Sequence, residues 1–166
     1  MNPLILTLTL DPASQAFFDE LRRAHFPPAR NFLSAHLTLF HALPGHERAA
    51  IEAELATVAA ATAPLELRVE KVVFMGRGVA YALESAPLRQ LHQQLQTRWR
   101  AWLTPQDRQP RRPHVTVQNK VEPAVARALF EELSAGFVPF RAEGVGLTLW
   151  EYKGGPWEAL SEWALG

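Results

Sequence analysis

The chain has 166 residues, of which 48% are hydrophobic and 20% are charged, and this composition is typical of a folded globular protein. Its 17 basic and 17 acidic side chains cancel, which excludes binding to nucleic acid or anionic lipid through net charge alone. The absence of cysteine excludes disulfides, thiolate zinc sites and cysteine nucleophiles.

The N-terminal stretch MNPLILTLTLDPASQ lacks the basic segment of a signal peptide, and Asp11 interrupts its apolar pattern early. No apolar run in the sequence reaches the ~18 residues that a membrane-spanning helix requires. We therefore expect a cytoplasmic protein with no membrane segment and no obligate protein partner.

The first half of the chain begins with a strand and a helix. Residues 3–10 are rich in β-forming side chains and predict a buried strand. Asp11 and Pro12 form a helix start, and the helical stripe ends near His25, before two prolines. The same reasoning predicts, in order, a strand at 36–42, a helix at 47–61, and strands at 65–75 and 78–84.

The second half repeats this mixture of strands and helices. It predicts a helix at 87–103, a strand at 114–119, a helix at 123–135, and strands at 137–152 and 157–164. Because the two halves are comparable in length and content, the sequence indicates an α+β fold with internal pseudo-two-fold symmetry.

One short pattern occurs in both halves. His36-Leu37-Thr38-Leu39 and His114-Val115-Thr116-Val117 share a histidine, a threonine and two aliphatic residues at the same spacing. Strand alternation places each histidine on the same face as its threonine and buries the aliphatic residues on the other face. Convergence of the two strands would bring together two imidazoles and two hydroxyl donors. Such a set suits in-line displacement at phosphorus, with one base, one acid and donors for the non-bridging oxygens.

The paired motifs and the closing stretch LTLWEYKGGPWEALSEWALG resemble the 2H phosphoesterase superfamily, which includes 2′-5′ RNA ligase-like proteins and cyclic phosphodiesterases. The resemblance implies one bilobal domain over residues 1–166, with two antiparallel sheets around a central cleft and helices packed outside. It also implies cleavage of 2′,3′-cyclic phosphates or 2′-5′ linkages, in RNA ends or small cyclic nucleotides, without a metal or cofactor.

By motif match, the resemblance makes His36 and His114 the catalytic residues and Thr38 and Thr116 the phosphate-binding residues. The expected product is a 2′-phosphate, with the 3′-oxygen as leaving group. We assign His114 as the base and His36 as the acid. The alternative is a non-catalytic protein that keeps the cleft to bind nucleotides or RNA.

Other residues are candidate substrate contacts. Alternation places Phe40 and Gln118 on the cleft face, where they would stack or hydrogen-bond, although edge packing explains them equally well. Arg111 and Arg112 precede the second motif and Lys120 follows it, so this basic cluster either binds phosphate or belongs to a solvated loop.

Aromatic and histidine side chains outside the motifs complete the candidates. Trp157 stands where many relatives carry Tyr, and it would contact a base or ribose through its ring alone. His41 is expected to face away from the cleft, and His92 is expected on a helix surface. The four histidines outside the motifs are scattered, so no metal site is predicted.

Overall fold

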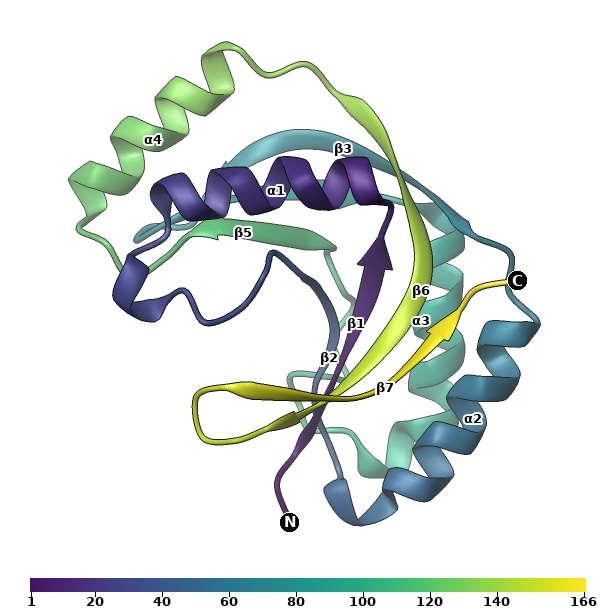
Figure 1. Ribbon diagram of the computed structural model, residues 1–166. Helices are drawn as coiled ribbons and strands as arrows, with labels where there is room; N and C mark the ends of the chain where they lie inside the picture. The colour runs from purple at the N-terminus through teal and green to yellow at the C-terminus, as the bar shows by residue number, and fades with distance from the viewer.

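The computed structural model describes residues 1–166 and has an α+β fold (Figure 1). The strands are β1 (Leu4–Leu10), β2 (Leu37–Leu43), β3 (Leu65–Phe74), β4 (Val79–Glu84), β5 (His114–Gln118), β6 (Phe140–Tyr152) and β7 (Trp157–Ala164). The helices are α1 (Pro12–His25), α2 (Arg48–Ala60), α3 (Ala86–Trp99) and α4 (Pro123–Ala135). Short 3-10 turns lie at Pro28–Arg30, Gly45–Glu47 and Arg100–Trp102.

The predicted order of strands and helices is confirmed, and side-chain caps fix two of the helix starts. The Asp11 carboxylate accepts a hydrogen bond from the Ser14 backbone N–H at 3.1 Å, and Pro12 occupies the first turn. The Ser85 hydroxyl caps α3 in the same way, accepting from the Leu88 N–H at 3.2 Å. Helix α3 ends at Trp99, earlier than predicted, because a 3-10 turn follows it.

The seven strands form one antiparallel sheet, not the two separate sheets that the resemblance implied. Its order is β2-β1-β6-β3-β4-β5, with β7 also paired to β6. The long strand β6 joins the two halves, because residues 140–144 pair with β3 and residues 144–151 pair with β1. The sheet curls into a half-barrel, with β2 and β5 as the edge strands at the two ends of this order (Figure 1).

The helices cover the outer face of this half-barrel and cross between the halves. Helices α1 and α4 pack against β3, β4 and β5, whereas α2 packs against β6 and β7. Helix α3 reaches β2, where the His92 ring stacks on Phe40 at 4.8 Å between centroids and the His92 Nε2 lies 3.1 Å from the Leu39 carbonyl. His92 is therefore buried, which corrects the prediction that it lies on a helix surface.

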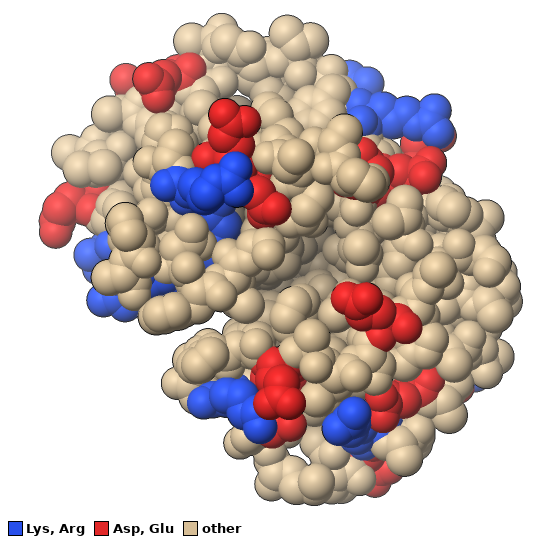
Figure 2. All heavy atoms as spheres, in the orientation of Figure 1, with Lys and Arg blue, Asp and Glu red and all other residues tan.

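A single cluster of 33 buried residues connects six strands and the four helices, and Leu160 and Trp163 of β7 pack against it, so the two halves share one core. On the face seen in Figure 2, acidic and basic groups are interspersed, and the walls of the central hollow are mostly uncharged. None of the helices combines the length and the apolar character needed to cross a membrane.

A β-bulge follows the motif in β2. Thr7 of β1 pairs with Thr38, but the preceding residue Leu6 pairs with Phe40, so Leu39 is an extra residue. Directly paired residues share a face, which places Thr38 on the cleft face and Phe40 on the helix face. Phe40 is fully buried against His92, so its prediction as a substrate contact is wrong.

Strand β5 has a bulge at the equivalent position. Thr116 pairs with Ala80, whereas Gln118 pairs with Val79, so Val117 is the extra residue. The bulge turns Gln118 to the helix face, where it is buried, and corrects its prediction as a cleft residue. Strand alternation assumes that each residue points to the face opposite its neighbour. A bulge adds one residue, so the faces predicted for the residues beyond it are reversed.

We expect Phe40→Ala to lower the free energy of unfolding by about 3–5 kcal/mol, because it removes a fully buried aromatic side chain. Phe32→Ala is the matched control, since that ring is 69% exposed and its loss should change stability by less than ~0.5 kcal/mol. Urea denaturation measures both. Equal effects of the two substitutions would contradict the burial of Phe40.

Candidate active site

The two motif histidines stand at the starts of the two edge strands, and each ring is held in the same way. The Nδ1 of His36 lies 2.9 Å from the Ser34 carbonyl, and the Nδ1 of His114 lies 3.1 Å from the Arg112 carbonyl. A carbonyl only accepts hydrogen bonds, so each Nδ1 carries the proton and each Nε2 keeps a free lone pair. Both rings are thus oriented to exchange a proton through Nε2.

The two motif threonines lie on the cleft face beside these rings. Thr38 pairs with Thr7 and Thr116 pairs with Ala80, so neither hydroxyl points into the core. Neither hydroxyl makes a hydrogen bond to another protein group, and both remain available as donors to a ligand.

Burial lowers the pKa of both motif histidines. The pKa of His36 falls from 6.5 to about 4, mainly through burial, with smaller contributions from the positive charges of Arg22 and His114. The hydrogen bond to the Ser34 carbonyl partly opposes this shift. Burial also lowers the pKa of His114, helped by the nearby Arg111. Both shifts favour the neutral rings, and a bound anion would raise both pKa values.

Two arginines connect the edge strands reciprocally. Arg22 of α1, which is 5% exposed, donates from Nη1 to the Thr116 carbonyl of β5 at 2.9 Å. Arg111, in the segment before β5, donates from Nε to the Thr38 carbonyl of β2 at 3.0 Å. Each arginine thus lies ahead of one motif and binds the threonine backbone of the other. Charge-assisted bonds of this kind hold the two edges at a fixed separation.

Further hydrogen bonds fix Arg22 and the segment that carries Arg111. Arg22 Nε also donates to the Asn31 side chain at 2.8 Å and to the Leu33 carbonyl at 3.0 Å. The buried Asp107 carboxylate accepts from the backbone N–H groups of His41 and Ala42, each at 2.9 Å. The loop before the first motif is thus tied to α1, and the loop before the second motif is tied to β2.

Two residues that organise the site, Arg22 and Asp107, were not predicted from the sequence. Nothing in the residue pattern distinguishes Arg22 from the neighbouring Arg23, which is exposed. Asp107 lies in a Pro- and Arg-rich loop whose path is decided only by tertiary contacts. Their roles in holding the loops become visible only in the three-dimensional structure, where each side chain meets backbone groups distant in sequence.

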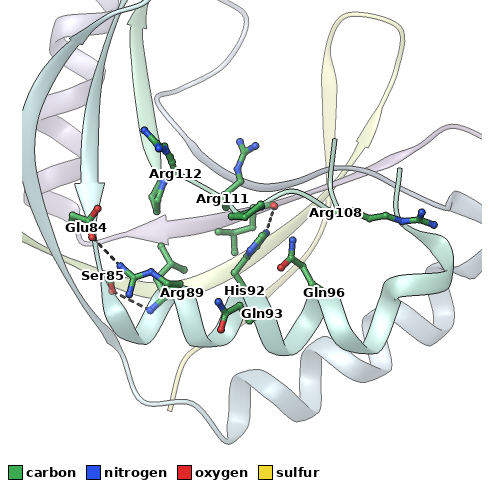
Figure 3. Close-up of a pocket in the computed structure, with 13 residues that line it drawn as sticks. Glu84, Ser85, Arg89, His92, Gln93, Gln96, Arg108, Arg111 and Arg112 are labelled. Carbon is green, nitrogen blue, oxygen red and sulfur yellow. Dashed lines mark hydrogen bonds and ion pairs between the residues drawn. The ribbon is translucent and has the colours of Figure 1, made fainter. Parts of the chain in front are cut away.

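Figure 3 shows the pocket between α3 and the segment 108–113, on the helix side of Arg111. The guanidinium groups of Arg111 and Arg112 point away from α3 in this view, whereas Arg89 turns toward Glu84, with which it forms an ion pair at 3.0 Å. Arg111 uses only Nε within the protein, so its two Nη groups remain available to a ligand.

Of the remaining candidate substrate contacts, Trp157 lies beside a motif histidine and Lys120 does not. The ring of Trp157 lies 4.8 Å from the His36 ring, centroid to centroid, and both line one pocket. Lys120 follows β5 in a left-handed conformation at φ 60° and lines none of the main pockets. No group of three or more His, Asp or Glu side chains is arranged to hold a metal ion.

Comparison with known proteins gives a family and several similar folds. The family model of the 2′-5′ RNA ligase superfamily matches residues 10–156. The structure of TT0787 of Thermus thermophilus is similar with a TM-score of 0.68 at 17% identity, covering 98% of this chain and 97% of that chain. E. coli LigT complexed with 3′-AMP gives a TM-score of 0.61 at 18% identity, covering 99% and 98%. A search of curated proteins found no match.

We expect Arg22→Met to lower the free energy of unfolding by about 1.5–3 kcal/mol, because it removes charged donors from buried carbonyls. Arg23→Met, one residue along the same helix and exposed, is the control and should change stability by less than ~0.5 kcal/mol. Chemical denaturation compares them. If Arg22→Met leaves the free energy of unfolding unchanged, the hydrogen bonds between α1 and β5 contribute nothing to stability.

Proposed function

The chain belongs to the 2′-5′ RNA ligase superfamily, and we propose that it is a metal-independent phosphodiesterase acting on 2′,3′-cyclic phosphates or 2′-5′ linkages of RNA or nucleotides. The observation that carries this proposal is the pair of histidines whose Nδ1 atoms are tied to backbone carbonyls and whose Nε2 atoms are free. Family membership supports phosphoesterase chemistry in general. The complexes of E. coli LigT with 3′-AMP, ATP and NADP+ support a nucleotide-like substrate.

The proposed reaction is an in-line displacement at phosphorus. One Nε2 takes a proton from water as the water oxygen attacks phosphorus, and the bond from phosphorus to the 3′-oxygen breaks. The second imidazole, protonated at the start, gives its Nε2 proton to the departing 3′-oxygen, which leaves the phosphate on the 2′-oxygen. The hydroxyls of Thr38 and Thr116 donate to the non-bridging oxygens, where negative charge increases in the transition state.

The pKa values favour His36 as the base and His114 as the acid, the reverse of the assignment made from the sequence. The base must be neutral before reaction, and the pKa of His36 is lowered further, to about 4, than the pKa of His114. The deeper lowering at His36 has burial as its largest cause, which no residue pattern reveals.

Arg111 would add positive charge at the same place. Its Nε bond to the Thr38 carbonyl fixes the guanidinium, and its free Nη groups can approach a phosphate oxygen. This arrangement provides the charge stabilisation that a metal ion supplies in other phosphoesterases.

His36→Ala and His114→Ala should each lower kcat by ~10²–10⁴ on 2′,3′-cyclic nucleotides while leaving the fold intact, because each removes a proton-transfer group. His46→Ala is the control, since its exposed side chain lies outside the cleft. Steady-state assays with EDTA present make this comparison, and EDTA itself should not reduce activity.

Three results would contradict the proposal. Loss of activity with EDTA and recovery with zinc or magnesium would point to metal chemistry. A 3′-phosphate product would exclude the proposed leaving group. Wild-type protein that binds nucleotides without turnover, with binding retained in both alanine variants, would instead identify a nucleotide- or RNA-binding protein.

We expect kcat/KM to be bell-shaped against pH, with both limbs on the acid side of 6.5. Activity falls as pH drops through the pKa of His36, about 4, because the base becomes protonated. It also falls as pH rises through the pKa of His114, lowered from 6.5, because the acid loses its proton. The two limbs report macroscopic values that belong to the coupled pair.

The profile of kcat should lie at higher pH than the profile of kcat/KM. Bound substrate is anionic and favours the imidazolium form of both rings, which raises both pKa values in the complex. Measurement of both profiles on one cyclic nucleotide separates the two cases. An alkaline limb of kcat/KM above 6.5 would contradict the burial of His114.

A further inference from the structure

A row of paired residues crosses the cleft floor from the first motif to β7. Thr38 pairs with Thr7, Thr7 pairs with Thr148, and Thr148 pairs with Glu162, so the four side chains share the cleft face. The row spans three interstrand spacings of ~4.8 Å each, or roughly 14 Å of backbone. It begins at a candidate phosphate-binding hydroxyl and ends at a carboxylate.

The same region of the cleft is a pocket that contains both a candidate catalytic group and aromatic rings. His36, Trp150, Trp157 and Glu162 all line it, and we call it the β7 pocket. The Trp157 ring packs beside the His36 imidazole and meets Trp150 edge-on at 5.9 Å between centroids. Indole faces next to a phosphate-transfer centre are suited to stacking a base.

The hydroxyls of the β7 pocket are largely occupied by one another and by an indole. Thr9 and Thr148 share a hydrogen bond at 3.1 Å, and the Trp150 N–H donates to the Thr7 hydroxyl at 2.9 Å. Glu162, in contrast, forms no hydrogen bond or ion pair with any other residue of the chain. Figure 2 shows acidic atoms on the β6–β7 side of the central hollow without basic atoms beside them.

Glu162 lines the β7 pocket and is solvent-exposed. Its carboxylate repels phosphate and accepts hydrogen bonds, so the part of a ligand that it favours is a group that donates them. Its position at the far end of the row from Thr38 leaves the phosphate end free of negative charge. Under the proposed function the phosphate binds at Thr38, and the nucleoside attached to it extends along the cleft floor toward Glu162. The partner of Glu162 is then the edge of the base.

We propose that the β7 pocket is a nucleobase site in which Trp157 stacks on the base and Glu162 selects guanine. This inference rests on the proposed function for the identity of the ligand. Guanine presents two adjacent donors, N1–H and the 2-amino group, which match the two oxygens of a carboxylate. Uracil places its single donor between two carbonyl oxygens, and adenine and cytosine place an acceptor nitrogen beside their amino group, so each meets the carboxylate with repulsion.

The test compares the four 2′,3′-cyclic mononucleotides in the wild type and in Glu162→Gln. In the wild type, kcat/KM should favour the guanine substrate by ~10-fold or more, as expected for a bidentate contact to a base. In Glu162→Gln this preference should fall to within ~3-fold through a higher KM for the guanine substrate, because one of two accepting oxygens is lost. The inosine substrate, which lacks the 2-amino group, should behave like the non-preferred bases in the wild type.

Glu158→Gln is the matched control. Glu158 lies on the same strand but on the opposite face, where it pairs with Lys153 at 3.2 Å, so its substitution should leave base preference unchanged. The inference is overturned if the wild type shows no guanine preference. It is also overturned if Glu162→Gln lowers kcat/KM equally for all four bases, or if Glu158→Gln has the same effect as Glu162→Gln.

Calorimetric binding of 2′-GMP and 2′-CMP distinguishes failure of this inference from failure of the proposed function. One outcome is that no cyclic nucleotide is turned over, but 2′-GMP binds preferentially and Glu162→Gln removes that preference. That outcome supports the base site and contradicts the enzymatic function. Turnover without base preference supports the enzymatic function and contradicts the base site.

Discussion

The cleft depends on hydrogen bonds that join two strands with no ladder between them. β2 and β5 lie at the two ends of the strand order β2-β1-β6-β3-β4-β5, and each carries one motif. The bond from Arg22 to the Thr116 carbonyl and the bond from Arg111 to the Thr38 carbonyl fix the distance between these edges. Everything that the two histidines can do together depends on that distance, because proton transfer in the transition state requires both rings within hydrogen-bond reach of the reacting atoms.

The two halves of the site have the same local structural features, but their surroundings differ. Both motifs have a histidine tied through Nδ1 to a carbonyl two residues earlier, a cleft-facing threonine and a bulge. Only the His36 side has the two tryptophans and Glu162, and only that ring has its pKa lowered to about 4. A nearly symmetric fold thereby gives the two rings different environments, as the proposed roles of base and acid require.

Periodic patterns predicted the elements well, because strand and helix periods and capping residues are local properties. The exceptions are informative. Phe40 and Gln118 were placed on the wrong face because a bulge adds one residue, and no signal in either motif marks a bulge. The single sheet was missed because it depends on β6 being shared by β1 and β3. Arg22 and Asp107 act through partners distant in sequence, and a single sequence contains no record of such contacts.

The sharing of β6 also governs when this chain can fold during synthesis. Strand β1 lies between β2 and β6 in the sheet, so its second partner is made only from residue 140 onward. Pairings at such sequence separation close slowly, since the loop entropy is lost before the contacts form. While the ribosome makes the intervening residues, the apolar β1 has only the edge strand β2 as a partner. The nascent chain therefore exposes an aggregation-prone edge until β6 has been synthesised, and this protein is expected to depend on chaperones more than a fold with local strand pairs.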